Sequence, residues 1–217
     1  MTAAIDAAGS RFRTALRPAW DLIDIHKRLS ESPGRRETEL SLNRGAVVFA
    51  VAAWQTFVEQ LTIAMVDAAT PAATAAAADK HLFSMLKANI DNQVKRLNVP
   101  NARKTLELWA WLGFDPTRVW ATTYSWQKQR SVYHGGWFND SATVTMLQAQ
   151  DDLDTYVLIR HKIVHGDLIP SEPRFARLAT GQRDGRPRLK RVDADRCLNF
   201  IQSLVTATTA ESNRRFP

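Results

Sequence analysis

The stretch from Glu39 to Ala68 reads ELSLNRGAVVFAVAAWQTFVEQLTIAMVDA, and it decides the fold class of this chain. Its apolar residues recur with helical periodicity and cover a broad face. A helix that is apolar over such a wide arc is normally covered by other elements on several sides. The sequence therefore predicts a long helix that runs through the centre of the core. The residues that define its apolar face are Leu42, Ala46, Val47, Phe49, Ala50, Ala53, Trp54, Phe57, Val58, Leu61 and Met65.

The chain has few glycines and many alanines, and helical patterns also dominate on both sides of this stretch. A first helix is expected from about Thr2 to Leu29, because Ser-Pro-Gly follows at 32–34. The region from Gln127 to Asn139, which holds two adjacent glycines, is interpreted as a loop or a broken helix. Further helices are predicted over 81–97, from Asn101 to Gly113, from Thr117, from Asp151 or Asp152 to Gly166, and from Asp193 onward. The expected fold class is all-α.

Charge is concentrated in one segment of this basic chain, whose formal net charge is +7. Between residues 174 and 191 the only acidic residue is Asp184. Such clustering suits a phosphate backbone, although a solvated surface loop is an equally good interpretation of charge alone. Two runs, Phe175 to Thr180 and Arg188 to Val192, flank the segment from Gly181 to Gly185 and predict a small two-stranded hairpin. The basic residues of the segment are Arg174, Arg177, Arg183, Arg186, Arg188, Lys190 and Arg191.

The length of 217 residues fits one domain with a sizeable core. We expect an N-terminal helix over 1–38, a core bundle over 39–170, the basic hairpin over 171–192 and a closing helix over 193–213. The lone Cys197 excludes an internal disulfide framework and is expected to be a buried, inert thiol. The N-terminus lacks a secretory pattern, and the most apolar stretch, 46–54, is too short for a bilayer span. These features predict a cytoplasmic protein without a membrane segment.

One Arg and two His gather near the predicted end of the helix that stops at Gly166. On a helical wheel Arg160 falls within the apolar arc, while His161 and His165 share a neighbouring face at its edge. A guanidinium on an apolar face needs a partner or a cleft. An imidazole can act as base or acid at neutral pH, and a guanidinium donates to phosphate oxygens. The grouping therefore suits cleavage of RNA without a metal ion.

The context of these residues resembles the HEPN superfamily, and within it the RiboL-PSP-HEPN group. The motif RHKIVH at 160–165, followed by Gly166, looks like the HEPN signature of Arg, a polar residue and a final His. Upstream, LNRGAVV at 42–48 and WQTFVE at 54–59 look like the long second helix of that group. The segments NVPN at 98–101 and LGFDP at 112–116 are similar to its middle block. The resemblance covers most of the chain, apart from 1–38 and 127–139.

The resemblance implies an antiparallel helical bundle that dimerises, so that two motifs face one cleft and cleave RNA without a cofactor or metal. The expected products carry a 2',3'-cyclic phosphate and a 5'-hydroxyl. Arg160 would bind the scissile phosphate, His165 would act as base or acid, and His161 would orient them. Lys162 and the basic hairpin would contact RNA phosphates. Such proteins often serve as toxins with a cognate antitoxin or in defence against phages.

Other interpretations remain open from the sequence. Arg160 could instead form a buried ion pair with an acid such as Glu59, and the two histidines could ligate zinc with Asp167 as a third ligand. The whole chain could be a catalytically silent HEPN module that binds RNA or a protein partner. A third possibility is a partner of a nucleotidyltransferase, without motif support. Tryptophans are candidates for stacking on RNA bases, although most should lie in the core, among them Trp109, Trp111, Trp120, Trp126 and Trp137.

Overall fold

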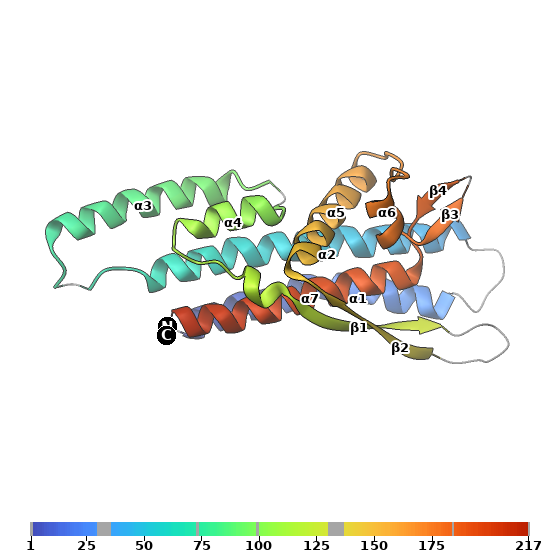
Figure 1. Ribbon diagram of the computed structural model, residues 1–217, viewed down its shortest axis with the longest axis horizontal. Coiled ribbons are helices and arrows are strands. Elements are labelled where there is room, and N and C mark those ends of the chain that lie inside the picture. Colours follow the sequence, from blue (N-terminus) through green and yellow to red (C-terminus); the bar gives the residue numbers. More distant parts are fainter. Residues whose placement is uncertain are drawn as a thin grey trace.

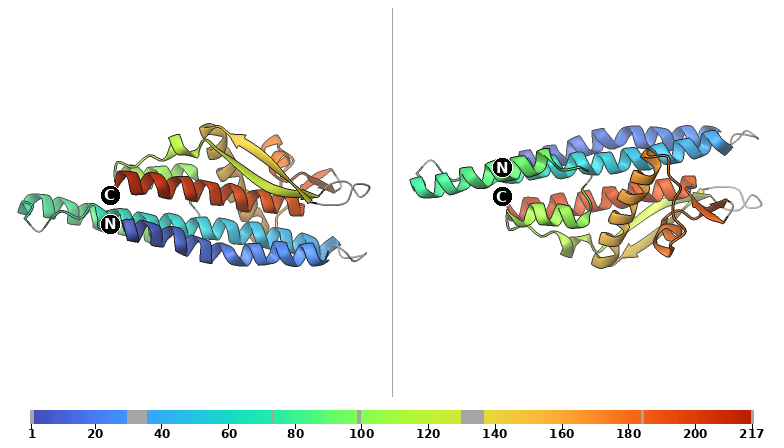
Figure 2. Two further views of the ribbon diagram at one scale, coloured as in Figure 1. Left: turned by 90° about the horizontal axis from the view of Figure 1, so that it is seen from below. Right: turned by 90° about the horizontal axis from the view of Figure 1, so that it is seen from above.

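Three long helices run along the long axis of the molecule and carry most of its core (Figure 1 and Figure 2). The computed structural model describes residues 2–29, 36–72, 74–98, 100–129, 137–183 and 185–216. Within these ranges the α-helices are α1 (Thr2–Leu29), α2 (Arg36–Ala68), α3 (Ala77–Lys95), α4 (Ala102–Ala110), α5 (Met146–Val164), α6 (Pro173–Leu178) and α7 (Arg191–Arg215). A 3-10 helix, η1 (Thr117–Trp120), precedes β1 (Thr122–Gln129) and β2 (Trp137–Val144), and β3 (Gly181–Arg183) and β4 (Arg186–Arg188) precede α7. The described chain is mostly helical, as predicted, but it has two small antiparallel sheets where one was expected.

Helix α2 lies at the centre of the core and packs against both α1 and α7. Its buried residues lie on several sides of the helix, as its broad apolar face predicts. At Gly45 the backbone of α2 approaches α1 so closely that an added Cβ atom would lie 2.9 Å from Leu22 Cδ1. Phe49 departs from the prediction, because it is 44% exposed.

The apolar part of α2 is long enough to span a membrane, but it is also largely buried in the core. By length and composition alone, the stretch Glu39–Ala68 would suffice to cross a membrane. In the structure, however, 56% of its most apolar window is buried inside the molecule. A mostly buried core helix of a globular protein meets the same criterion of length and hydropathy.

Helix α1 has the predicted bounds, and it completes the core, a role that the sequence left open. One face of α1 is fully buried against α2 and α7. These residues are Ile5, Ala8, Phe12, Leu16, Ala19 and Ile23, and their spacing of three and four places them on one side of the helix. Cys197 on α7 is also fully buried, and burial raises the pKa of its thiol well above the usual value. The thiol therefore belongs to the core, as expected.

Three buried tryptophans fasten the segment between α3 and β1 to the long helices. The indole nitrogen of Trp54 donates to Pro100 O, and that of Trp109 donates to Thr62 Oγ1, both at 2.9 Å. Trp120 donates to Thr208 Oγ1 on α7, also at 2.9 Å. The ring of Trp54 lies 6.4 Å from that of Trp109 and 6.1 Å from that of Trp120. Each large apolar ring is thus buried with its polar group satisfied.

The β1–β2 hairpin was not predicted. The helix expected from Thr117 is only the short η1, and the residues from Gln127 to Gln129 and from Trp137 to Asn139 lie in paired strands rather than in a loop. Residues 130–136, which belong to the same predicted loop, lie outside the described residues. The hairpin packs on α7, where the ring of Tyr124 lies 5.4 Å from that of Phe200. Strands, rather than a helix, therefore cover this side of α7.

The basic segment also differs from its prediction. Pro173 occupies the first turn of α6, where proline is favoured. The helix buries the side chains of Phe175 and Leu178. The strand expected over 175–180 is therefore wrong, because 175–178 are helical and 179–180 lie in no strand. A two-stranded hairpin is present, but β3 lies in the expected turn, and of the second expected strand, 188–192, only Arg188 is paired, opposite Gly181. The closing helix is also longer than the predicted range 193–213.

Asp193 is the third residue of α7 and not, as predicted, its N-cap, which is Lys190; its side chain completes a capping box and holds the hairpin to the helix. Its carboxylate accepts from the backbone nitrogen of Lys190 at 2.8 Å, and from the backbone nitrogen and hydroxyl of Thr180 at 3.0 and 2.8 Å. The residue is only 1% exposed. Burial raises the pKa of this carboxyl, and its hydrogen bonds oppose the rise. The carboxyl group is therefore held by three donors from Thr180 and Lys190, which precede α7.

We expect Asp193→Ala to lower the free energy of unfolding by about 2 kcal/mol, because it removes the N3 side chain of the capping box and leaves buried donors unpaired. Urea denaturation followed by circular dichroism measures this change. The matched control is Asp21→Ala, which removes an exposed carboxylate from α1. Equal stability of the two variants would show that Asp193 does not anchor the start of α7.

Candidate functional site

Helix α5 carries the candidate motif, and its two ends are set by different signals. The helix begins at Met146 with Thr145 as its cap, whose hydroxyl accepts from Gln148 N at 3.3 Å. The prediction that Asp151 or Asp152 caps this helix is therefore wrong. The predicted stop at Gly166 is confirmed, because this glycine has φ 73° and the nitrogen of the next residue bonds to Lys162 O at 2.8 Å.

The last turn of α5 projects beyond the core. Leu153, Tyr156 and Ile159 are fully buried, whereas the motif residues that follow become progressively exposed. Arg160 is partly buried, and His161 and His165 are exposed. The two imidazole rings lie 4.3 Å apart between centroids, at an interplanar angle of 52°. The structure thus brings both histidines to one surface, on the turn that holds Arg160.

Arg160 has no ion pair with any described residue. Its Nε atom is buried and has no hydrogen-bond partner. Glu59, the partner suggested by the sequence, instead accepts from Gln55 Nε2 at 2.9 Å. Arg44 on α2, the helix against which α5 packs, also has a buried Nε without a hydrogen bond. The alternative of a structural Arg160–Glu59 pair is therefore wrong, and the guanidinium on the turn of the histidines has one buried nitrogen without a partner among the described residues.

The third group proposed for a zinc site is engaged elsewhere. Asp167 pairs with Lys162 at 3.1 Å, and both side chains are largely at the surface. Among the described residues no group of three His, Cys, Asp or Glu side chains is placed to hold a metal ion. The pair of imidazoles therefore stands beside an arginine and a lysine, not within a carboxylate cluster.

The basic segment does not present all of its cations to solvent. Arg177 pairs with Asp151 at 2.7 Å and with Asp152, and Arg191 is only 8% exposed and donates to Gln127 O at 3.2 Å. Arg174 pairs with Glu172 at 3.0 Å. We therefore assign Arg177 and Arg191 a structural role rather than a role in ligand binding. The residues that retain exposed surface are Arg174, Arg186, Arg188 and Lys190; the side chain of Arg183 lies outside the described ones.

A cavity of about 370 Å³ separates the β3–β4 hairpin from the ends of α1 and α2. His26 at this site is 6% exposed, and its Nδ1 lies 2.7 Å from Asn43 Oδ1, while Asn43 Nδ2 donates to Leu189 O at 3.2 Å. Burial lowers the pKa of His26, although Asn43 and Glu39 oppose this. The chain of hydrogen bonds ties the hairpin to both helices. It positions Arg188 and Lys190 on the cavity wall.

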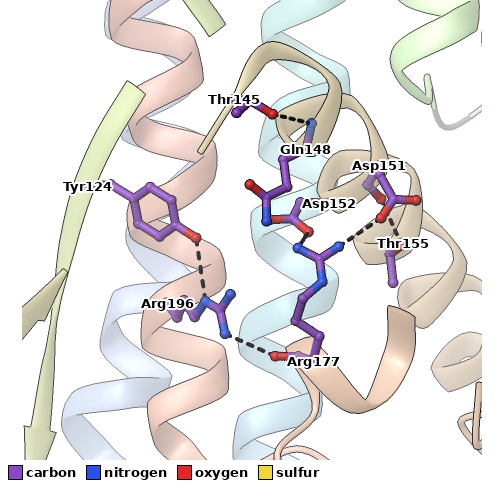
Figure 3. A network of polar contacts seen from close by, with 8 residues as sticks. All are labelled: Tyr124, Thr145, Gln148, Asp151, Asp152, Thr155, Arg177 and Arg196. Carbon is purple, nitrogen blue, oxygen red and sulfur yellow. Dashed lines mark hydrogen bonds and ion pairs between the residues drawn. The ribbon is translucent and has the colours of Figure 1, made fainter. Parts of the chain in front are cut away.

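A buried polar network that was not predicted from the sequence joins α5 to its neighbours (Figure 3). Asp152 is 0% exposed and pairs with Arg177 from α6. Burial raises the pKa of Asp152, while the positive charges of Arg177 and Arg196 oppose the rise. Arg196 on α7 donates to Arg177 O at 3.0 Å and lies 3.4 Å from the hydroxyl of Tyr124 on β1. Four elements thus meet around one buried carboxylate.

The sequence does contain one sign of this network. Asp152 falls on the same helical face as Ala149 and Tyr156, both fully buried, and an acid on a buried face requires a partner. The identity of that partner cannot be read from spacing, because Arg177 lies on a different helix. The network does not touch the motif; it orients the helix that carries it.

We expect Arg177→Met to lower the free energy of unfolding by about 3 kcal/mol, because it leaves the buried Asp152 carboxylate without its counter-ion. Denaturant unfolding measures the loss. The double variant Asp152→Asn with Arg177→Met should recover part of it, since a neutral amide needs no counter-ion. Arg174→Met on the same helix is the control, because its ion pair is exposed and contributes little. A loss no greater than that of the control would contradict the role given to Arg177.

Comparison of the chain with protein-family models, with curated proteins and with solved structures gave no match. The functional assignment therefore rests on the motif and its geometry. Of the predicted site residues, Arg160, His161, Lys162 and His165 lie on or directly after the last turn of one helix. The basic residues lie on α6, which packs against α5, and on the hairpin and α7 start beyond it.

Proposed function

We propose that this chain is a metal-independent endoribonuclease with a HEPN-like site on the last turn of α5. The observation that carries the proposal is the partly buried Arg160, whose Nε has no hydrogen-bond partner, on the turn that also presents His161 and His165. A guanidinium with an unpaired buried nitrogen costs free energy, and a phosphate-binding role for the rest of the group would account for its retention. A phosphate group fits its planar array of donors. The neighbouring imidazoles supply the proton transfers that RNA cleavage requires.

The reaction proceeds by transfer within the RNA chain. An imidazole, assigned to His165, removes the proton of a 2'-hydroxyl, and the resulting oxygen attacks the adjacent phosphorus. The bond from phosphorus to the 5'-oxygen breaks, and a second imidazole returns a proton to that oxygen. Arg160 balances the negative charge that builds on the phosphoryl oxygens. The products are a 2',3'-cyclic phosphate and a 5'-hydroxyl, and His161 positions the other two groups.

A second copy of the chain completes the site in this proposal. One Arg and two His are few groups for binding, acid and base roles, and two-fold pairing doubles them. Val164 and Leu168, which flank the histidines, are 53% and 56% exposed, and a subunit interface would cover such apolar surface. The packing of α1 and α7 against α2, with α5 also in contact with α2, supports the proposal of a HEPN-like bundle. The role in toxin–antitoxin pairing or phage defence, with a cognate partner in the cytoplasm, follows from the same resemblance.

The alternative is a catalytically silent module that binds RNA or a protein partner through the basic hairpin. The exposed Arg186 and Lys190 favour this second candidate, since they stand outside the α5 motif. A silent module would bind RNA with strong salt dependence and would not cleave it. Its binding would be unchanged by His165→Ala and weakened by reversal of Arg186 and Arg188. Cleavage is therefore the property that separates the two.

We expect the wild-type protein to cleave a mixture of single-stranded and transfer RNAs in the presence of EDTA. Arg160→Ala and His165→Ala should each lower the rate by at least about 100-fold, because they remove a phosphate ligand and a proton-transfer group. The 5'-hydroxyl ends are identified by direct kinase labelling, and the cyclic phosphate by 3' ends that accept a ligated label only after the ring is opened and the phosphate is removed. His81→Ala, at an exposed histidine of α3, is the matched control and should leave the rate unchanged.

Loss of activity in EDTA with recovery on adding zinc would overturn the mechanism. Full activity of His165→Ala would remove that residue from the site. Salt-dependent binding without cleavage by any variant would favour the silent module.

We expect Val164→Asp and Leu168→Asp to convert the dimer to monomers and to abolish cleavage, because a charge replaces apolar surface at the proposed interface. Light scattering at micromolar concentration reports the mass. Leu147→Asp at the other end of α5 is the control, since Leu147 is 72% exposed and lies away from the motif. A wild-type protein that is monomeric in this measurement would contradict the composite site.

A further inference from the structure

A second cavity, of about 310 Å³, lies between the end of α3 and helix α4, at the part of the molecule shown on the left of Figure 1. Its walls come from elements that the motif does not use. We propose that this cavity binds one unpaired base of a single-stranded nucleic acid, with the flanking phosphates held by Arg96 and Lys104. The inference rests on the proposed function in one respect, in that the strand is taken to be the RNA substrate.

The aromatic wall of the cavity is Trp111, the residue that ends α4. It is 54% exposed, in contrast to Trp109 and Trp120, which are fully buried. No described aromatic ring or cation stacks on its indole, whereas the half-buried Trp126 lies against Tyr124 and Arg196. Trp111 therefore keeps a free ring face, which is what a stacking platform for a base requires.

The floor of the cavity is apolar. Leu108 is 5% exposed, and Leu97 is partly buried and packs against the core. A base inserted beside Trp111 would meet these side chains at its edge or opposite face. The amide of Gln93, which also lines the cavity, can donate to or accept from the polar edge of any base. The site is therefore suited to stacking with little discrimination between bases.

The electrostatics of the cavity favour a polyanion. The segment 93–111 contains Lys95, Arg96, Arg103 and Lys104, with Glu107 as its only acid. Glu107 pairs with Arg103 at 2.9 Å, so its charge is already balanced. The side chains of Arg96 and Lys104 are exposed and have no ion pair among the described residues. Two cations and one exposed aromatic ring thus line the same cavity, and a single strand carries both charge and unpaired bases for them to bind.

A protein partner fits this surface less well than a nucleic acid. An apolar docking site would extend over several exposed apolar residues, but here Trp111 stands among charged and amide groups. Leu82 and Met85, the exposed apolar residues of α3, lie in its first half, away from Arg96. A duplex also fits poorly, because its bases are stacked and paired. The preferred ligand is therefore a strand with at least one unpaired base.

The test measures binding by fluorescence anisotropy in the full chain with His165→Ala present throughout, so that the strand stays intact. The probes are a single-stranded RNA of about 12 nucleotides, the same sequence as DNA, and an RNA duplex. Trp111→Ala should weaken binding of the single strands by roughly 5-fold to 100-fold, and Trp111→Phe should restore most of it. Binding of the duplex should change little. Equal effects on RNA and DNA are expected, because the contacts are to bases and phosphates.

The charge arm of the test compares two double reversals of equal size. Arg96→Glu with Lys104→Glu should weaken binding and lower the dependence of affinity on salt, because two phosphate contacts are lost. Arg13→Glu with Arg17→Glu makes the same change of net charge on α1, where both residues are exposed, and should leave most of the affinity. Unaltered affinity of Trp111→Ala for single strands, or equal losses from the two reversals, would overturn the proposal.

The outcome is independent of cleavage. If the wild type fails to cleave RNA but Trp111→Ala still loses single-strand binding, the cavity stands and the nuclease falls. If cleavage is established and the Trp111 variant binds as its parent does, the cavity assignment falls alone. Loss of a protein partner by Trp111→Ala without loss of RNA binding would assign the surface to protein contact instead and overturn the proposal.

Discussion

The burial of α2 is the constraint on which the rest of this structure depends. A helix that is apolar around most of its circumference is unstable in water until several elements cover it. Helix α1 approaches it at Gly45, α7 packs along it, and α5 crosses it. The indole of Trp54 extends the contact to the segment before α4 through its bond to Pro100 O. The other helices are thus arranged so that they cover the apolar surface of α2.

Apolar burial does not by itself decide how the covering elements are oriented. Buried polar groups supply that specificity here, since each has only one arrangement in which its charge or hydrogen bonds are satisfied. Asp193 fixes the start of α7. Asn43 on α2 bonds to His26 on α1 and to Leu189 O, directly after the hairpin. Asp152 joins α5 to α6 through its ion pair with Arg177. The orientation of α5 matters most, because its last turn presents the histidines.

Local patterns predicted the elements whose determinants are local. The bounds of α1 and the stop of α5 at Gly166 follow from periodicity and from a glycine that adopts positive φ. The start of α5 was missed because Asp152, a good cap by residue type, is used for an ion pair with a distant arginine. The β1–β2 hairpin was missed although its strand residues alternate, with Tyr124 turned inward between exposed neighbours.

The candidate site shows the same division. The motif residues could be found from spacing, because one helical turn places them together. The assignment of Arg177 and Arg191 to ligand binding could not be corrected from sequence, since only the fold reveals that both charges are used internally. Trp111 differs from Trp109 only in the side of α4 to which it belongs. A shift of two residues along a helix separates a core position from a surface one.

The place of α7 in the chain has a consequence for synthesis. Helix α7 closes the core between α1, α2 and β1, and Asn213 near its end donates to Asp6 near the start of α1 at 2.8 Å. Figure 1 shows the two ends of the chain side by side. During translation α1 and α2 leave the ribosome first and can pair, but their apolar surfaces stay uncovered until α7 emerges. The core can therefore assemble only after α7 has been synthesised. A nascent chain that already contains the α5 motif still lacks α7, against which α1, α2 and β1 pack.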